Sequence, residues 1–275
     1  MRTLKRLFQF ISIYATALGL LWGVKIVYGF SDYLIPPPLE VLQVASQNGL
    51  LYVKAVLDTL AVAIAGHMVA IVLATAVGLV GRLGTWPGNL TRTAAYNLQA
   101  YPIVAVAPII FLFLGDGLAS RLLIAAMICY FPVLLSFIGI FAKSVEEVEH
   151  FFRITGRINW RLELSIRTFE NLDKITTVIV GSGTMALVGT IIAEFLAATN
   201  GIGYIIRKAL YQSNLAKILV ALFLIGLCSS LYLSLIETIG GRIKIRLYGH
   251  KAEYMIFCLP FVWRLLEAQV HTAVF

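Results

Sequence analysis

The sequence predicts an all-α protein that crosses a membrane about six times. Hydrophobic residues make up 60% of the 275-residue chain and charged residues only 13%, and the mean hydropathy is +0.88. A soluble domain of this length needs far more charge to cover its surface. A bilayer core about 30 Å thick takes roughly 20 apolar residues per spanning helix, and apolar runs of that order recur along the chain.

The first apolar run covers residues 7–30 and follows three basic residues. A signal peptide is the alternative, but the run is too long for its hydrophobic region and no clear small-x-small cleavage site follows. We therefore expect a span that stays in the protein. Residues 35–38 read Ile-Pro-Pro-Pro, a rigid extended element, and a short helix is expected from Leu39. Residues 58–80 are the second predicted span.

Glycine and proline in residues 82–89 predict a turn after this span. A third span is predicted over residues 95–114, with Pro102 and Pro108 inside it. Membrane helices tolerate proline when neighbouring groups satisfy the freed carbonyls. The remaining spans are expected at residues 120–141, 175–196 and 218–239.

Beyond the sixth span the chain is basic and then apolar again. The run at residues 254–266 contains Pro260 and Arg264 and is too short to span, so we expect an interfacial helix there. The predicted organisation has three parts: an N-terminal span with its extracytoplasmic segment (1–57), a transmembrane core (58–240) and a basic cytoplasmic tail (241–275).

The placement of lysine and arginine predicts the orientation. With a cytoplasmic N-terminus, fifteen of these residues fall on the cytoplasmic side. Basic residues concentrate on that side of membrane proteins, so both termini and residues 142–174 are predicted to be cytoplasmic. Because the basic residues lie between apolar runs, the net charge of +8 indicates topology rather than nucleic-acid binding. The five on the opposite side are Lys54, Arg121, Arg207, Lys208 and Lys217.

Residues 142–174 interrupt the apolar sequence with charges and aromatic side chains around Gly156. The spacing of apolar residues on each side of this glycine predicts two short amphipathic helices with a hinge between them. A helix lying at the lipid headgroups is one interpretation, and an apolar stripe seated in another protein's groove is the other. Bulk at Phe151, Phe152 and Trp160 favours the second, because such side chains serve as anchors in pockets.

Four stretches follow one another in an order and spacing typical of one protein family. They are LIPPPLEVLQ (residues 34–43), AYPIVAVAPIIFLFLGDG (100–117), the segment with Gly156, Trp160 and Ile166, and VGTIIAEFLAATNGIGYII (188–206). The chain thus resembles the transmembrane permease subunits of binding-protein-dependent ABC importers, most closely the nitrate, sulfonate, taurine and bicarbonate group. The resemblance covers about residues 34–240 and implies the fold of a type I importer permease with a cytoplasmic coupling helix.

The resemblance implies that residues 142–174 dock into a separate ATP-hydrolysing subunit. Where the family carries Glu-Ala-Ala this chain has His150-Phe151-Phe152, and where the family carries Leu-Pro it has Thr168-Phe169. These departures leave three interpretations open: docking of a divergent ATPase, poor coupling, or one half of an unequal pair. The chain lacks the motif G-x-x-x-x-G-K-[ST], so ATP is expected on the partner, and we expect neither cofactor nor metal on this chain. The expected coupling residues are His150, Phe151, Phe152, Gly156, Trp160 and Ile166.

Further partners are implied by the same resemblance. We expect a second permease copy, with a homodimer favoured and an unequal pair left open, an extracytoplasmic solute-binding protein, and the bilayer of the inner membrane. The turn after residue 196 is expected to dock the binding protein, the alternative being a plain turn. The chain would conduct a small polar or anionic solute and catalyse no reaction. The docking residues are Asn200, Gly201 and Gly203.

Polar and small residues inside the spans are candidates for the translocation path. Glu194 is the one carboxylate deep in its span, and ionisable groups there usually face a cavity or a partner. A gate role and a structural hydrogen bond are both open for it. Ser182 and Gly183 lie in the same span, which the resemblance puts at the pore. For His67, a hydrogen bond between helices is favoured over a ligand or proton-relay role.

Two other classes of function remain as alternatives. A self-contained secondary transporter or channel predicts inverted repeats and several buried ion-coordinating residues. An intramembrane hydrolase would pair Ser182 with His67, although Gly-Ser-Gly is common in helix packing and no oxyanion element is evident.

Overall fold

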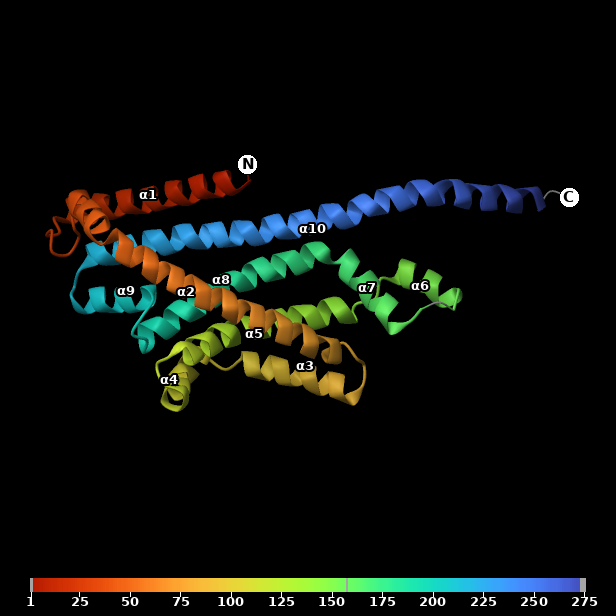
Figure 1. Ribbon diagram of the computed structural model, residues 1–275, viewed down its shortest axis with the longest axis horizontal. Coiled ribbons are helices and arrows are strands. Elements are labelled where there is room, and N and C mark those ends of the chain that lie inside the picture. Colours follow the sequence, from red (N-terminus) through yellow and green to blue (C-terminus); the bar gives the residue numbers. More distant parts are fainter. Residues whose placement is uncertain (1, 157, 273–275) are drawn as a thin grey trace. The chain divides into compact units, whose positions relative to one another are not determined.

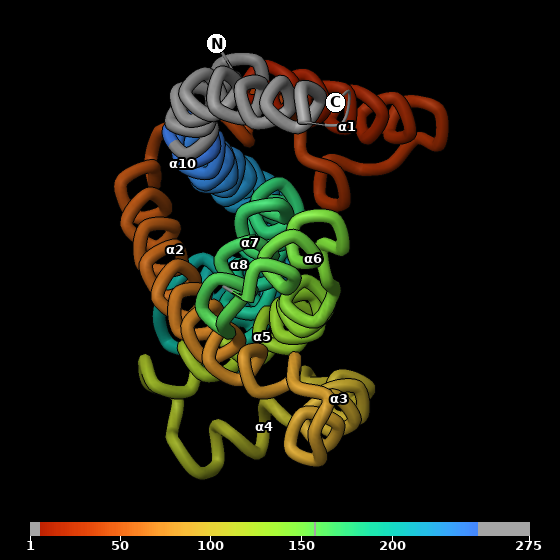
Figure 2. Tube along the Cα trace, turned by 90° about the vertical axis from the view of Figure 1, so that its right-hand side faces the viewer, coloured from red at the N-terminus to blue at the C-terminus, as the bar shows by residue number. Residues whose placement is uncertain are grey.

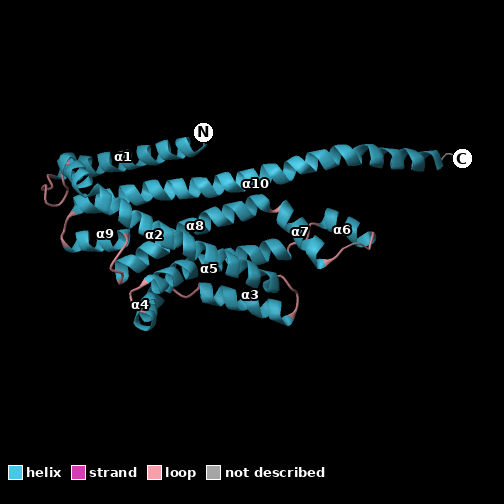
Figure 3. Cartoon of the chain, in the orientation of Figure 1, coloured by secondary structure: helices cyan, strands magenta, loops and turns pink. Residues whose placement is uncertain are grey.

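The structure is a computed structural model that describes the backbone of residues 2–156 and 158–272 and the side chains of residues 6–156 and 158–246. Within these ranges the ordered elements are ten α-helices, with no strand (Figure 3). Five described helices are long and apolar enough to span a membrane, or six if one bent pair is a single span. The predicted all-α, multi-spanning class is therefore confirmed. The chain divides into two compact units with their boundary between Leu235 and Ile236.

α1 (Arg2–Tyr28) contains most of the first predicted span, and α2 (Pro38–Gly81) contains the second. The sequence predicted a separate short helix before the second span, but α2 is a single helix of 44 residues. Pro37 precedes it in an extended conformation, and the next proline lies in the first turn, where the missing amide hydrogen breaks no helical bond. Asp58 lies within this helix, and its carboxylate pairs with Arg121 at 2.9 Å.

The third predicted span, residues 95–114, is wrong as a single helix. α3 (Trp86–Gln99) and α4 (Ile103–Leu114) are bent by 92° where they meet. The break falls at Pro102, because proline lacks an amide hydrogen and disfavours a helical conformation in the residue before it. α3 also begins within the turn predicted at residues 82–89.

α2, α5 (Leu118–Ala142) and α8 (Leu172–Leu196) pack against one another to form the core (Figure 2). Ala125 of α5 lies between two glycines. A Cβ added to Gly66 of α2 would lie 2.9 Å from the Cβ of Ala125, and one added to Gly189 of α8 would lie 3.2 Å from its Cα. Small residues thus allow the three backbones to approach closely. α5 and α8 coincide with the fourth and fifth predicted spans.

α6 (Glu146–Ile154) and α7 (Trp160–Glu170) connect α5 to α8, and α9 (Ile202–Tyr211) follows α8. Figure 1 shows α9 at one end of α8 and α7 at the other. Gly156 lies between α6 and α7 with a φ of +66°, a conformation that favours glycine. Two short helices joined at this glycine are what the sequence predicted.

α10 (Leu215–Thr272) contains the sixth predicted span. It also includes residues 254–266, for which the sequence predicted a separate interfacial helix. The side chains of that stretch lie outside the described residues, so its interfacial placement stays a prediction. α1 packs on the first part of α10, where the Tyr14 hydroxyl donates to the carbonyl of Leu219 at 2.7 Å.

Candidate functional site

Large apolar side chains are exposed where α6 ends and α7 begins. Phe151 is 62% exposed, Ile154 72% and Trp160 58%, whereas the other exposed side chains described between α5 and α8 are polar or charged. Ile154 was not among the residues predicted from the sequence. Among the predicted coupling residues, the structure exposes His150, Phe151, Gly156 and Trp160 and half-buries Phe152 and Ile166.

A buried arginine holds this segment against the end of α5. The Arg167 guanidinium makes two hydrogen bonds to the Glu149 carboxylate, at 2.7 and 3.0 Å, and donates to the carbonyls of Phe141 and Ala142 at 2.6 and 3.2 Å. Both charged side chains are buried. Such two-pronged arginine–carboxylate pairs fix geometry as well as adding energy. Arg167 thereby joins α7 to α6 and joins both helices to the last turn of α5.

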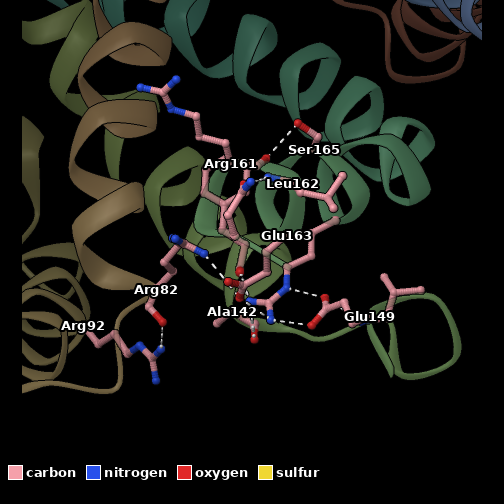
Figure 4. A network of polar contacts seen from close by, with 12 residues as sticks. Arg82, Arg92, Ala142, Glu149, Arg161, Leu162, Glu163 and Ser165 are labelled. Atoms are coloured by element: carbon pink, nitrogen blue, oxygen red, sulfur yellow. Dashed lines mark hydrogen bonds and ion pairs between the residues drawn. The ribbon is translucent and has the colours of Figure 1, made fainter. Parts of the chain in front are cut away.

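The same network reaches α2. Glu163 of α7 pairs with Arg167 at 2.5 Å and with Arg82, at the end of α2, at 3.4 Å. Arg92 of α3 in turn donates to the carbonyls of Gly81 and Arg82. Figure 4 shows Arg82, Arg92, Ala142, Glu149 and Glu163 gathered around this network. The segment is therefore anchored to the last residues of α5 and to the end of α2, two of the three core helices.

Arg167 and Glu149 are not among the site residues predicted from the sequence. The spacing of Glu163 and Arg167, four residues apart on one helix face, was a readable signal for an ion pair. The partnership with Glu149 was not readable, because the two residues are 18 positions apart in different helices. Burial of both charges becomes evident only once the helices are packed.

The pair shifts the pKa of both groups. Hydrogen bonds from the Arg167 guanidinium lower the pKa of Glu149, and the hydrogen-bonded Glu149 carboxylate raises the pKa of Arg167. A carboxyl with a lowered folded-state pKa stabilises the fold above its unfolded value and loses that contribution as pH falls through the folded value. The pair therefore stabilises the segment fully at neutral pH, and the contribution falls as pH decreases from the usual glutamate value of 4.5.

Replacing Arg167 should loosen α6 and α7. Arg167→Gln leaves the Glu149 carboxylate buried without its cation, so we expect amide hydrogen exchange in both helices to accelerate by at least about tenfold. Mass spectrometry of the purified complex measures this. Arg161→Gln, at an exposed arginine of the same helix, is the matched control. Equal exchange in the two variants would contradict the anchoring role.

Glu194 lies fully buried near the opposite end of α8. The Thr59 hydroxyl donates to its carboxylate at 2.7 Å, the Arg121 guanidinium at 3.1 Å and the amide of Gly203 at 3.0 Å. Helices α2, α5 and α9 thus meet at one carboxylate. Of the two roles that the sequence left open, the structural hydrogen bond is the one whose contacts are present. A role in the translocation path stays a prediction.

The turn before α9 passes over the Glu194 carboxylate. Gly201 has a φ of +92°, and a Cβ there would overlap the carboxylate. A Cβ at Gly203 would lie 2.5 Å from the carbonyl oxygen of Ile191. Both glycines are buried, so the close approach they permit is to their own chain. Of the three residues predicted to dock a binding protein, only Asn200 is exposed.

Removing the cation at this cluster should destabilise the fold. Arg121→Gln leaves Glu194 enclosed without a countercharge, and we expect a loss of about 3–5 kcal/mol in unfolding free energy. The double variant with Glu194→Gln should recover much of that loss, because the neutral amide needs no cation. Thermal unfolding of the purified complex measures both. Strictly additive effects of the two substitutions would show that the charges do not interact.

A second polar cluster joins three spans. His67 of α2 has Nδ1 2.7 Å from the Tyr232 hydroxyl of α10 and Nε2 2.8 Å from the Ser182 hydroxyl of α8. The predicted hydrogen bond of His67 between helices is confirmed, and Tyr232 is a partner that the sequence did not reveal. Ser182 and Gly183 are both buried. The Ser182 hydroxyl also contacts the carbonyl of Ile179 at 3.1 Å. A serine so enclosed offers a substrate no access, which disfavours the hydrolase alternative.

These features define a class of protein. Several apolar helices, one sharply bent pair, and short helices with exposed aromatic side chains describe a multi-spanning membrane protein with an apolar surface between two spans. The model of the family described as binding-protein-dependent transport system inner membrane component matches residues 66–245. The chain belongs to this family.

Individual relatives agree with the family. The formylaminopyrimidine transport permease protein ThiX of Halalkalibacterium halodurans is 23% identical over 231 residues, which cover 82% of this chain and 91% of the relative. The riboflavin transport system permease protein RibX of Chloroflexus aurantiacus is 33% identical over 132 residues, 47% of this chain and 48% of the relative. A probable ABC transporter permease protein of Haemophilus influenzae is 25% identical over 138 residues, half of this chain and 56% of the relative.

The predicted function is confirmed at the level of the family. The chain is a membrane-spanning permease subunit of a binding-protein-dependent importer, a transport component rather than an enzyme. Membership implies an ATPase subunit and a solute-binding protein as general partners and the inner membrane as the location. The alternative of a self-contained transporter is not supported, because transport in this family depends on a binding protein.

Proposed function

We propose that the exposed end of α6 and α7 is the coupling element on which the ATPase subunit docks. The observation that carries the proposal is the exposure of Phe151, Ile154 and Trp160 at one end of an otherwise polar segment. Aromatic side chains of this kind anchor interfaces when they enter a partner's pocket. The Arg167 network supports the proposal, because a segment fixed to α5 and α2 passes on a displacement that a loose loop would absorb.

The orientation and the assembly belong to the same proposal. Fifteen basic residues against five favour cytoplasmic termini and a cytoplasmic α6–α7 segment. One chain provides part of the translocation path, and a second permease provides the rest. A homodimer is the simplest form. The departure at His150-Phe151-Phe152 keeps an unequal pair as the alternative.

Loss of an anchor should release the ATPase. We expect Trp160→Ala to weaken ATPase binding by about tenfold or more, since truncating a central aromatic anchor removes at least about 1–2 kcal/mol. Co-purification and titration of the ATPase onto the reconstituted permease measure this. Trp86→Ala is the matched control, because Trp86 is 76% exposed at the start of α3. Normal ATPase stoichiometry and affinity in the Trp160 variant would contradict docking at this surface.

For the solute, we propose a small, polar nitrogen heterocycle. Two relatives carry formylaminopyrimidine and riboflavin in their names, and both compounds are of this kind. The nitrate, sulfonate, taurine and bicarbonate group, suggested by the sequence resemblance, is the alternative.

Uptake into proteoliposomes should separate the two solute classes. With the ATPase and binding protein present, we expect ATP-dependent accumulation of a labelled pyrimidine or riboflavin and none of nitrate or taurine. The Trp160→Ala complex is the control for coupling. Accumulation of nitrate or taurine without either heterocycle would instead favour the narrower group.

A further inference from the structure

A cleft of about 500 Å³ lies between the last two turns of α5 and the first two turns of α8. α6 and α7 connect these same two helix ends along the chain. The cleft is separate from the ion-pair network of Arg167, since none of the residues of that network lines it. It is therefore a second feature of this end of the core, and its lining has its own chemistry.

Each helix end contributes one lysine to the lining of the cleft. Lys143, directly after α5, is exposed, and its ammonium group makes no hydrogen bond or ion pair with any residue that the structure describes. Lys174 donates to the side-chain oxygen of Asn171 at 2.9 Å, a neutral acceptor. The one carboxylate of the lining is Asp173, in the first turn of α8, where it complements the helix dipole. Two lysines against one carboxylate leave the lining with a positive charge.

The hydroxyl groups of the lining are already used within their own helices. Ser136 donates to the carbonyl of Pro132 at 2.7 Å, and Thr177 donates to the carbonyl of Asp173 at 2.9 Å. The ammonium groups are therefore the charged donors that remain for a ligand. An anionic acceptor matches them, because hydrogen bonds between two charged groups are the strong ones. A neutral heterocycle of the kind proposed as the solute would leave the positive charge unmatched.

The depth of the cleft indicates an amphipathic ligand. The apolar spans predicted from the sequence end at residue 141 and begin again at residue 175, so Lys143 and Lys174 lie just outside them. Ile140 and Val178, which line the inner part of the cleft, lie within them. The cleft thus extends from the level of the lipid headgroups into the hydrocarbon. A small soluble anion would fill only its charged end.

Topology alone accounts for lysines at this end of the spans, but it does not account for the open space between them. Gly139 lines the cleft in the body of α5, where glycine costs about 1 kcal/mol relative to alanine. A Cβ added there would meet no heavy atom of a neighbouring element within 4 Å. The glycine is therefore not required for helix packing, and its small size keeps the wall of the cleft open.

We propose that this cleft binds the phosphodiester headgroup of an anionic phospholipid, with the first carbons of an acyl chain against Gly139, Ile140 and Val178. Basic pockets between membrane helices bind such headgroups. One phosphodiester carries the single negative charge that the lining lacks. The inference goes beyond the proposed function and is independent of the solute and of ATPase docking. The bound lipid would lie between the two helix ends that α6 and α7 connect.

Photolabelling of the reconstituted complex tests the assignment. The complex is placed in nanodiscs of phosphatidylcholine that contain increasing fractions of a phosphatidylglycerol with a diazirine near the start of one acyl chain. Mass spectrometry should find the label in residues 136–143 or 171–178. We expect Lys143→Gln with Lys174→Gln to raise the half-saturating fraction of this lipid by about tenfold or more, since each lysine near the surface contributes about 1 kcal/mol.

Two controls separate a built site from general attraction. Arg242→Gln with Arg246→Gln removes the same charge at exposed residues of α10, on the same predicted side of the membrane, and should leave labelling of the cleft unchanged. Gly139→Phe should abolish that labelling although both lysines remain, because the ring fills the apolar part of the cleft. Gly139→Ala, which adds a single carbon where there is space, should retain it.

Loss of labelling in the lysine variant and in Gly139→Phe, with retention in both controls, supports the lipid site. Unchanged labelling in the lysine variant overturns the inference, and so does an equal loss in the α10 control. Displacement of the labelled lipid by inorganic phosphate assigns the cleft to a soluble anion instead of a lipid and overturns it. Absence of label from the cleft in the unaltered complex also overturns it. None of these outcomes bears on ATPase docking, which the Trp160 variant tests.

Discussion

The carboxylate of Glu194 is enclosed where four helices meet, and its charge is tolerated there only because hydrogen-bond donors face it from three of them. An isolated carboxylate in such a place would be strongly disfavoured. Because the carboxylate needs these donors, Thr59 of α2 and Arg121 of α5 both face Glu194 on α8. It also explains the glycine at position 201, since any side chain there would overlap the carboxylate. The turn and the first residues of α9 are thus held against the core by contacts with this one group.

A second buried carboxylate–arginine pair lies where α6 and α7 meet the last turn of α5. There the buried carboxylate is Glu149, and its cation, Arg167, also binds the last carbonyls of α5. The two clusters differ in what they enclose. The Glu194 cluster closes a turn onto the core, whereas the Arg167 cluster stiffens a segment whose far end is apolar and exposed. A partner that binds the aromatic side chains would therefore act on α5 and α2 through these ion pairs and hydrogen bonds.

The membrane spans were easier to predict from the sequence than the breaks within them. Hydropathy alone located the apolar runs of α5, α8 and α10, because a bilayer sets both their length and their composition. The 92° break at Pro102 was missed, since proline is tolerated inside some membrane helices, and Pro108 and Pro132 do remain helical here. The same limit applies to the sites. Gly156 and the aromatic residues around it were readable from local spacing. The partners Arg121 and Tyr232 were not, because each contact joins residues far apart in sequence.

The three polar clusters together indicate how the helices can move. α2 and α8 are linked at one end through Thr59 and Glu194 and in the middle through His67 and Ser182. α5 joins α8 through Arg121 and joins α7 through the carbonyls that Arg167 binds. Close contacts at Gly66 and Gly189 leave little room for these helices to slide past one another. Under the proposed docking of the ATPase, a displacement applied through α6 and α7 is expected to tilt α2, α5 and α8 as one body. Under the proposed function, such a connection favours alternating access by rigid-body rocking over a mechanism that separates these helices, because separation would break buried ion pairs.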